Sequence, residues 1–353
     1  MDTHLSAQSE RVALVTGATG FMAHHLIPTL LDRGWEVRAT ARGPRPAWLA
    51  GAVGYGSVDL ADPGADLKAV CAGVDTVFHL AGATSSLSSP EEMHQSNAVA
   101  TANLVEGALG AGVGRFVHMG STSVYGEEEP LPQPVVETVE PHPSRGYGKA
   151  KWLAEQAVWA GARKGLPAVV LRPVSVFGPG AIKLVASAVL DVAIERFAGQ
   201  ATFAVERAPV ELRLVHIADV VGAAMHLATA DLPQVEGKAY NVVAPWYPSA
   251  LELAALITTH LGLELQACEA PPCGLSLTSR RKAWEAMTAG GMVPAILFTD
   301  ERLRFLKKQN RNNRLSIDAL LGTGYALAYG TAEAVARGMR ETIDWYLAQG
   351  WIR

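Results

Sequence analysis

The chain has 353 residues, of which 49% are hydrophobic and 18% charged, and its formal net charge is −4 at pH 7. This composition predicts a globular protein with a full core and excludes an intrinsically disordered chain. The mild negative charge gives no reason to expect nucleic acid as a partner. Residues 1–11 are polar, and no apolar run reaches the roughly 18 residues of a membrane span. We therefore expect no secretory signal, no integral membrane span and a cytoplasmic location.

The cysteines are few and scattered. Cys71, Cys268 and Cys273 make an odd count without a C-x-x-C pair, so we expect no disulfide framework and a reducing compartment. No group of cysteines and histidines stands at the spacing of metal ligands, so we expect no metal site.

The first 180 residues alternate short apolar runs with longer helical patterns. Continuous β-branched runs separated by helices predict a parallel sheet covered on both faces. With a glycine-rich first turn, they predict an α/β fold: a doubly wound parallel sheet, or Rossmann domain, over residues 1–180. In chain order the expected elements are strand 12–16, helix 21–33, strands 36–40, 55–58 and 76–80, helix 97–110, strand 115–119, helix 147–164 and strand 168–172.

After Pro173 the alternation loosens. We expect strands at 214–217 and 239–243 and helices at 251–261 and 332–347. Residues 181–353 would then form mainly a smaller substrate-binding lobe over the carboxyl ends of the strands, with 214–243 returning strands to the main sheet.

A glycine turn, TGATGFMA at residues 16–23, joins the first strand to the first helix. Gly17 permits a tight turn, Gly20 lets the backbone approach a pyrophosphate, and small Ala23 allows close helix–strand packing. The helix N-terminus then offers free N–H groups and a positive dipole end to phosphates. The residues expected to contact a dinucleotide here are Gly17, Thr19, Gly20, Phe21 and Met22.

Two arginines follow in the second strand. An enzyme that selects NAD usually carries Asp or Glu at the end of this strand, to hold the ribose 2′-hydroxyl. No carboxylate stands between Arg38 and Arg42, and a guanidinium can bind a 2′-phosphate through two hydrogen bonds. We therefore expect NADP as the cofactor, with NAD as the alternative; the competing hypothesis is that both arginines are solvated surface charges.

An acid–base pair is predicted at the start of helix 147–164. Tyr147 and Lys151 are four residues apart and share one helix face. A lysine cation nearby would favour the phenolate of a tyrosine whose ordinary pKa is about 10. Ser121, Thr122 and Ser123 follow the strand 115–119, and one of these hydroxyls can hydrogen-bond a substrate oxygen.

Taken in order, these motifs resemble those of the extended short-chain dehydrogenases/reductases, the superfamily of NAD-dependent epimerases and dehydratases. Within this superfamily, the motifs most resemble those of the 3β-hydroxysteroid dehydrogenase-like reductases. The resemblance runs from residue 12 to residue 346. It is carried by TGATGFMA at 16–23, Asp59-Leu60, HLAG at 79–82, Asn97, STSVYG at 121–126, YGKAK at 147–151 and LRPVSVFGPG at 171–180.

The resemblance implies roles for these residues. Tyr147 would be the acid–base, Lys151 its partner and a ribose ligand, and Ser121 the catalytic hydroxyl, with Thr122 and Ser123 as less favoured stand-ins. Members of the superfamily often form homodimers through two long helices, which here would be 97–110 and 147–164. The remaining implied cofactor contacts are Asp59 and Leu60 along the adenine, Leu80, Ala81 and Gly82 beside the ribose and pyrophosphate, Asn97, and Pro173 and Val174 facing the nicotinamide.

One departure from the family bears on the substrate. Sugar-nucleotide enzymes commonly carry an arginine four residues before the histidine that stands here as His216, and that arginine binds the diphosphate. This chain has Leu212 there and Arg213 one place on. Segment 293–306 also resembles the 3β-hydroxysteroid dehydrogenase-like group, and its apolar half would line a hydrophobic cavity. Both features favour a hydrophobic ketone or secondary alcohol, such as a sterol-like compound or a β-keto acid.

Residues 280–314 form a basic stretch, with nine Lys or Arg against three acids and hence a local charge of +6. It would touch a membrane surface peripherally, receive an anionic carrier, or be a solvated face.

For the whole chain, the leading hypothesis is an NAD(P)-dependent dehydrogenase or reductase acting on a small-molecule substrate. The alternatives are a nucleotide-sugar epimerase or dehydratase with bound NAD, and a non-enzymatic redox-sensing module.

Overall fold

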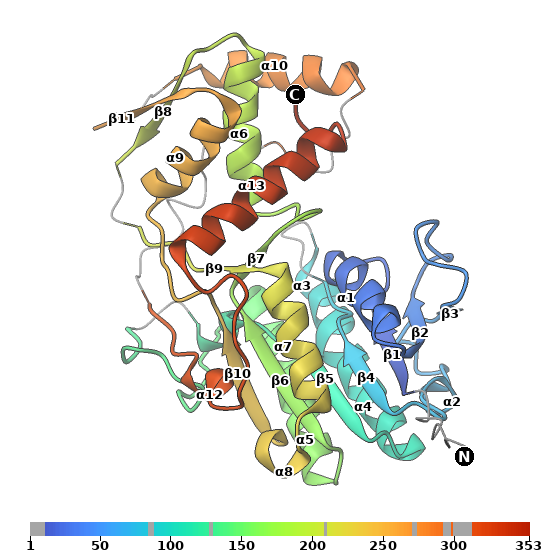
Figure 1. The fold of residues 1–353 in the computed structure, drawn as a ribbon. Coiled ribbons are helices and arrows are strands. Elements are labelled where there is room, and N and C mark those ends of the chain that lie inside the picture. Colours follow the sequence, from blue (N-terminus) through green and yellow to red (C-terminus); the bar gives the residue numbers. More distant parts are fainter. Residues whose placement is uncertain are drawn as a thin grey trace, which may run out of the picture.

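The computed structural model describes residues 11–83, 88–126, 130–207, 210–269, 274–291, 298 and 313–353. A seven-stranded sheet forms its centre, and every pair of neighbouring strands in it is parallel. The predicted doubly wound α/β fold is confirmed (Figure 1). Across the sheet the order is β10 (Lys238–Val242), β6 (Ala168–Pro173), β5 (Arg115–Met119), β4 (Thr76–His79), β1 (Val12–Thr16), β2 (Glu36–Ala41) and β3 (Gly54–Ser57).

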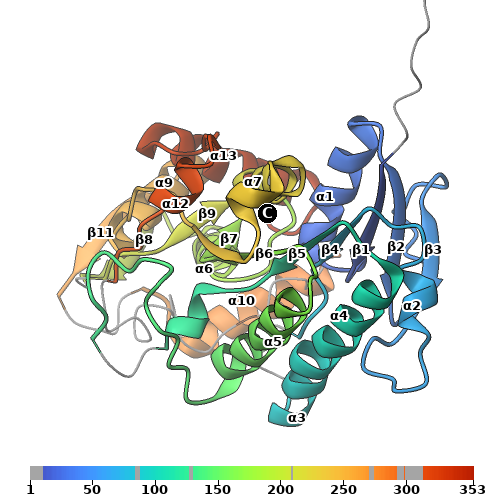
Figure 2. The same ribbon diagram turned by 90° about the horizontal axis from the view of Figure 1, so that it is seen from below.

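Helices cover both faces of this sheet, which is why its central strands are apolar on both sides. All residues of β5 and β6 are buried. Figure 2 shows α1 (Phe21–Asp32) and α7 (Ile217–Thr229) on one face, and α4 (Ala100–Ala111) and α5 (Gly146–Arg163) on the other. Short helices α2 (Leu67–Val70), α3 (Pro90–Met93) and α8 (Leu232–Val235) lie in the connections.

The helix expected from residue 97 begins earlier and is irregular. Ser89 and Glu92 form a capping box and Pro90 occupies the first turn, so α3 begins at Pro90. A π-helical segment, η1 (His94–Val99), then joins α3 to α4. The predicted start is therefore wrong, and Asn97 lies in a π-helical turn, a feature that often marks functional sites.

The smaller lobe lies beyond the carboxyl ends of the main strands, at the top of Figure 1. Its helices pack around an apolar cluster that includes Phe203, Leu212 and Met339. Its elements are α6 (Val185–Phe197), α9 (Ala250–Leu261), α10 (Leu277–Ala289), α13 (Ala332–Ala348) and the two-stranded sheet of β8 (Thr202–Glu206) and β11 (Glu264–Cys268).

The strands expected to return to the main sheet divide between two sheets. β10 lies beside β6 at the sheet edge, and α12 (Asp318–Leu321) packs near it. β9 (Leu214–His216) instead pairs with β7 (Ser175–Phe177) in a separate two-stranded sheet. The prediction that 214–217 joins the main sheet is therefore wrong, because β7 leaves the main sheet directly after β6 and provides β9 with its partner.

Two further expectations are corrected. Cys268, at the end of β11, is disulfide-bonded, whereas Cys71 is a buried free thiol. Within the basic stretch, Arg280 is buried and forms an ion pair with Asp191 of α6, so it does not belong to a solvated face. Of the helices in the described residues, none combines the length and apolarity needed to cross a membrane.

Candidate active site

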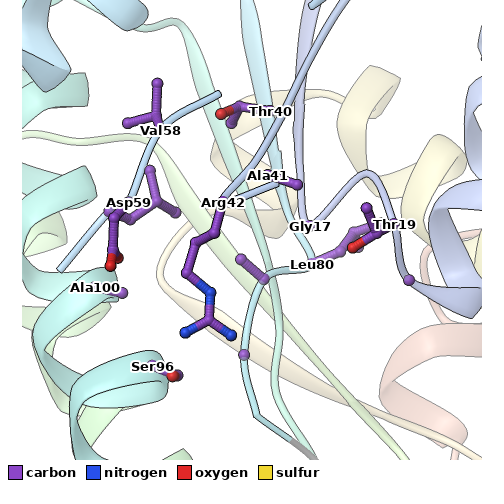
Figure 3. A pocket seen from close by; sticks show the side chains of 14 residues that line it. Gly17, Thr19, Thr40, Ala41, Arg42, Val58, Asp59, Leu80, Ser96 and Ala100 are labelled. Atoms are coloured by element: carbon purple, nitrogen blue, oxygen red, sulfur yellow. The ribbon is translucent and has the colours of Figure 1, made fainter. Parts of the chain in front are cut away.

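A groove runs along the carboxyl ends of β1, β2 and β4, where doubly wound sheets bind ligands (Figure 3). The pocket in this groove has a volume of about 170 Å³. Nine of the predicted cofactor residues line it: Gly17, Thr19, Gly20, Arg42, Asp59, Leu60, Leu80, Ala81 and Gly82. Five lining residues were not predicted, namely Thr40, Ala41, Val58, Ser96 and Ala100. Most of these adjoin predicted residues in sequence, which is the signal that would have found them.

The glycine turn is shaped by a close backbone contact. Gly17 has φ +72°, and a Cβ at this position would lie 2.8 Å from the backbone nitrogen of Ala81. Only glycine fits this conformation and this space. The turn therefore packs directly against the segment that follows β4, and the N-terminus of α1 faces the groove with no side-chain cap on its N–H groups.

A second close approach lies at Gly82, at the other end of the groove. A Cβ on Gly82 would stand 2.4 Å from Oδ1 of Asn97 and 3.3 Å from Nζ of Lys151. Oδ1 of Asn97 is buried and accepts no hydrogen bond from the described residues. An unsatisfied buried acceptor beside a lysine ammonium and a bare backbone is a fitting cradle for ribose hydroxyl groups. The residues present thus fit the sugar of a dinucleotide.

The two arginines of the second strand lie in different places. Arg42 lines the pocket, and in Figure 3 its guanidinium extends into the groove. The guanidinium has no hydrogen-bond or ion-pair partner among the described residues, whereas the carbonyl oxygen of Arg42 accepts a hydrogen bond from Ser57. Arg38 bonds Glu36 and the carbonyl oxygen of Ala72 at the end of α2, and does not line the pocket. The prediction that both arginines contact the cofactor is therefore not supported for Arg38.

Tyr147 and Ser121 form the candidate acid–base site. Burial raises the pKa of Tyr147 to about 12, and a hydrogen bond with Ser121 opposes this increase. Ser121 lies two residues beyond the end of β5, and its Oγ donates to Oγ of Ser123 at 3.1 Å. Thr122 turns its hydroxyl toward the carbonyl oxygen of Pro173. Of the three candidate hydroxyls, Ser121 is thus the one that reaches Tyr147.

Lys151 lies one turn further along α5 and is almost completely buried. Its Nζ donates to the carbonyl oxygen of Met119 at 2.8 Å. Burial lowers the pKa of Lys151 to about 8, and the charge of Glu155 opposes this decrease. Glu155 is itself held by a buried ion pair with Arg172. At neutral pH the ammonium is therefore charged, and two of its N–H donors remain beyond the one bonded to Met119.

Four other predicted contacts, Phe21, Met22, Pro173 and Val174, do not line the groove. Phe21 borders a second hollow of about 410 Å³ beyond the glycine turn. Met22 packs partly buried against the core. Pro173 ends β6, and the N–H of Val174 donates to the carbonyl oxygen of Val242. Among the described residues no cluster of potential metal ligands occurs.

The substrate side of the site lacks the arginine of sugar-nucleotide enzymes. Leu212, which stands in that position, is fully buried in the apolar core of the smaller lobe. Most of segment 293–306, the expected cavity lining, lies outside the described residues.

Comparison with known proteins identifies the family. A model of the NAD dependent epimerase/dehydratase family matches residues 13–242, which is more than half of the chain. The chain belongs to this family. Membership implies a nicotinamide dinucleotide cofactor, in keeping with the cradle at Gly17 and Gly82. The predicted resemblance to extended short-chain dehydrogenases/reductases is confirmed, and a 3-beta-hydroxysteroid dehydrogenase is among the relatives.

Two curated relatives are reductases or dehydrogenases. The chain is 34% identical over 189 residues to the 2-alkyl-3-oxoalkanoate reductase of Stenotrophomonas maltophilia (strain K279a), covering 49% of this chain and 53% of the relative. It is 34% identical over 184 residues to the 3-beta-hydroxysteroid dehydrogenase of Mycolicibacterium neoaurum, covering 47% of this chain and 48% of that protein. The chain thus spans about half the length of the curated relatives it matches.

Among solved structures, the fold is similar over nearly the whole chain. The UDP-glucose 4-epimerase of Thermotoga maritima superposes with a TM-score of 0.73 at 20% identity, covering 96% of this chain and 99% of the epimerase. At this identity the similarity establishes the fold and nothing about the substrate.

Proposed function

We propose that the protein is an NADP(H)-dependent reductase that converts the carbonyl group of a hydrophobic small molecule to a secondary alcohol. The observation that carries this proposal is the assembly of Ser121, Tyr147 and Lys151 at the ribose end of the nucleotide groove. The names of two relatives, an oxoalkanoate reductase and a hydroxysteroid dehydrogenase, support the same class of reaction.

The proposed mechanism assigns one task to each side chain. When bound, the dinucleotide supplies the hydride that reaches the carbonyl carbon. Ser121 redirects its proton from Ser123 to the substrate oxygen, which fixes the carbonyl next to Tyr147. Tyr147, neutral because of its raised pKa, then donates its proton to the developing alkoxide. The Lys151 ammonium stabilises the resulting phenolate across a site of low dielectric constant.

Two features support a hydrophobic substrate. At the position where sugar-nucleotide enzymes carry an arginine that binds the diphosphate, this chain has Leu212. Leu212 is fully buried and packs in the apolar core of the smaller lobe. The matched relatives are named for an alkyl oxoalkanoate and a hydroxysteroid. We therefore place β-keto acids and sterol-like ketones first among the candidate substrates.

Arg42 supports NADP over NAD. Its guanidinium faces the groove without a protein partner in the described part of the chain, and Thr40 and Ala41 replace the carboxylate that would hold a 2′-hydroxyl. A fixed planar cation suits a 2′-phosphate.

The proposal also includes a homodimer through α4 and α5, which lie side by side on one face of the sheet (Figure 2), and a cytoplasmic location. Sedimentation of the purified protein would test the dimer.

Steady-state assays with NADPH test the proposed function. We expect consumption of NADPH with at least one β-keto acid or hydroxysteroid-derived ketone, and none with UDP- or dTDP-sugars. The alternative, an epimerase or dehydratase, predicts NAD that stays bound through purification and a sugar nucleotide converted without net consumption of cofactor. Turnover of a nucleotide sugar, with no ketone reduced, would overturn the proposal.

A further inference from the structure

A continuous chain of hydrogen bonds runs between β1, β4 and α4 through His79, the last residue of β4. His79 is fully buried and stands beside Thr16 of β1 in the sheet register. Its Nδ1 lies 2.8 Å from Oγ1 of Thr16, and its Nε2 lies 2.8 Å from Oγ1 of Thr101 on α4. Beyond these, Thr16 accepts the N–H of Ala81 at 3.2 Å, and Thr101 donates to the carbonyl oxygen of Asn97 at 2.5 Å.

The donors and acceptors at the two ends determine the state of the imidazole. The only proton of the Thr101 hydroxyl is used by a carbonyl, so Thr101 must accept from His79, and Nε2 carries the hydrogen. The neutral ring has a single N–H, so Nδ1 accepts the hydroxyl proton of Thr16. Burial lowers the pKa of His79 to about 3, with the charge of Lys151 acting in the same direction. The ring is therefore neutral at every physiological pH.

The two ends of this chain hold the same short segment. At one end, Thr16 fixes Ala81, whose backbone abuts Gly17 of the glycine turn. At the other, Asn97 donates through Nδ2 to the carbonyl oxygen of Ala83 at 3.1 Å. Gly82 lies between the two fixed points. His79 does not line the groove, and its two ring nitrogens act on it through the hydroxyls of the two threonines.

We propose that His79 is a positioning residue that sets both walls of the ribose cradle at Gly82. Its Nδ1 side holds Ala81 against the glycine turn, and its Nε2 side holds the π-helical turn that aims Oδ1 of Asn97 beside Lys151. The inference rests on the proposed function for the identity of the ligand, a nicotinamide dinucleotide. His118 gives the contrast: it is the neighbour of His79 on β5, equally buried, and its two ring nitrogens have no partner among the described residues. Burial of a histidine at this depth thus does not by itself require such a network.

Two substitutions separate the two sides of the ring. His79→Asn keeps an acceptor near the position of Nδ1 and loses the Nε2 donor, whereas His79→Gln keeps a donor near Nε2 and loses the acceptor. We expect His79→Asn to bind NADPH within about twofold of the unmodified protein and to lose about tenfold in kcat, since Asn97 and Lys151 lose their alignment. We expect His79→Gln to raise the Kd for NADPH about tenfold, since Ala81 is released from the glycine turn. Equal effects of both variants on Kd and kcat, or no effect of either, would overturn the proposal.

A threonine pair supplies the matched control. Thr101 and Thr342 are both fully buried and each donates to the carbonyl oxygen four residues earlier in its helix, but Thr342 lies on α13 in the smaller lobe. Thr101→Val is expected to reduce kcat as His79→Asn does. Thr342→Val removes the same kind of hydrogen bond and is expected to leave both Kd and kcat unchanged. If the two valine variants behave alike, the effect is structural and the proposed role is wrong.

Nitrogen NMR of the unmodified protein measures the tautomer and the titration of His79 directly, and it needs no variant that might misfold. We expect the Nε2–H form of His79, with no titration between about pH 5 and 9. An Nδ1–H form, or a ring that titrates in this interval, would contradict the proposal. These readouts, and the Kd for whichever of NADPH or NAD the protein binds, need no substrate. They therefore distinguish an error about His79 from an error about the reductase activity.

Discussion

The two ends of the nucleotide groove are built from different kinds of residue. At the adenine end, Arg42 and Asp59 are exposed and line the pocket. At the catalytic end, Lys151 and Asn97 are almost fully buried, and burial raises the pKa of Tyr147 to about 12 and lowers the pKa of Lys151 to about 8. Exposed charges act through contact with a ligand and are screened by salt, whereas buried groups act through their protonation state. The residues proposed to recognise the cofactor are therefore exposed to water, whereas those proposed for the chemistry are shielded from it.

The largest expected effect lies at the catalytic end. Tyr147→Phe removes the proton donor and keeps the ring, and we expect kcat to fall about a thousandfold with little change in the Kd for NADPH. Tyr240→Phe is the control, because Tyr240 is buried in β10 and its hydroxyl has no partner in the described residues. It should leave kcat unchanged. A Tyr147→Phe enzyme of ordinary activity would revive the hypothesis of a redox-sensing module.

The buried ammonium of Lys151 is expected to lower the free energy of unfolding, although the proposed mechanism needs it. Its pKa in the folded protein, about 8, lies below the ordinary 10.5, so the unfolded chain binds more protons between these values. The cost is complete below pH 8, at about 3 kcal/mol, and disappears as the pH rises toward 10.5. Lys151→Met also leaves the Met119 carbonyl unbonded, so we expect a net gain of about 2 kcal/mol at pH 7 and inactive enzyme.

Urea unfolding of both proteins at neutral and alkaline pH measures this effect. The advantage of the variant should shrink as the pH rises and reverse near the ordinary pKa of lysine, where only the loss of the hydrogen bond to Met119 remains. A variant less stable than the unmodified protein at pH 7 would show that the buried ammonium is better satisfied than its contacts indicate.

The same titration predicts the pH dependence of the reaction. The ammonium of Lys151 supports proton transfer only while it is charged, so kcat/KM for ketone reduction should fall above about pH 8, tenfold for each pH unit. Thermal midpoints recorded across the same range serve as the control for loss of fold. A profile that stays flat to about pH 10 would remove Lys151 from the mechanism.

The smallest effect is expected at the adenine end. Arg42→Ala should raise the KM for NADPH about tenfold and leave that for NADH unchanged, and added salt should weaken the preference in the unmodified enzyme. Arg38→Ala is the matched control, since Arg38 is held by Glu36 and Ala72 outside the pocket. An equal loss in both variants would indicate a general effect of positive charge rather than contact with a 2′-phosphate.

Much of the nucleotide-binding half could be predicted because its signals are local. Continuous apolar runs placed the strands of the main sheet, and β1 and β5 have the predicted bounds. The smaller lobe gave weaker signals. In α6, ten of 13 residues are buried, including Asp191 and Glu195, so its polar residues do not mark a side that faces solvent. The pairing of β9 with β7 joins two strands of three residues, and only the tertiary structure determines such a pairing.

The candidate site shows the same division. The glycine turn and the Tyr147–Lys151 pair follow from spacing within one element. Spacing did not distinguish the two arginines, because Arg38 in β2 and Arg42 just beyond its end are four residues apart, which places them on the same side of an extended segment. Four residues of strand span about 13 Å, so only Arg42 reaches the carboxyl end. The network through His79 joins residues 63 and 22 positions apart, and it depends on strand register that spacing alone does not reveal.

The most direct test of the central claim is the thermal midpoint of the purified protein with NADPH, NADH, UDP-glucose and a dTDP-sugar. A ligand at a hundred times its Kd adds about 2.7 kcal/mol, or roughly 4 °C for a chain of this length. The account predicts such an increase with NADPH, a smaller one with NADH and none with the sugar nucleotides. An increase with a sugar nucleotide, in protein that retains NAD and does not respond to NADPH, would contradict it.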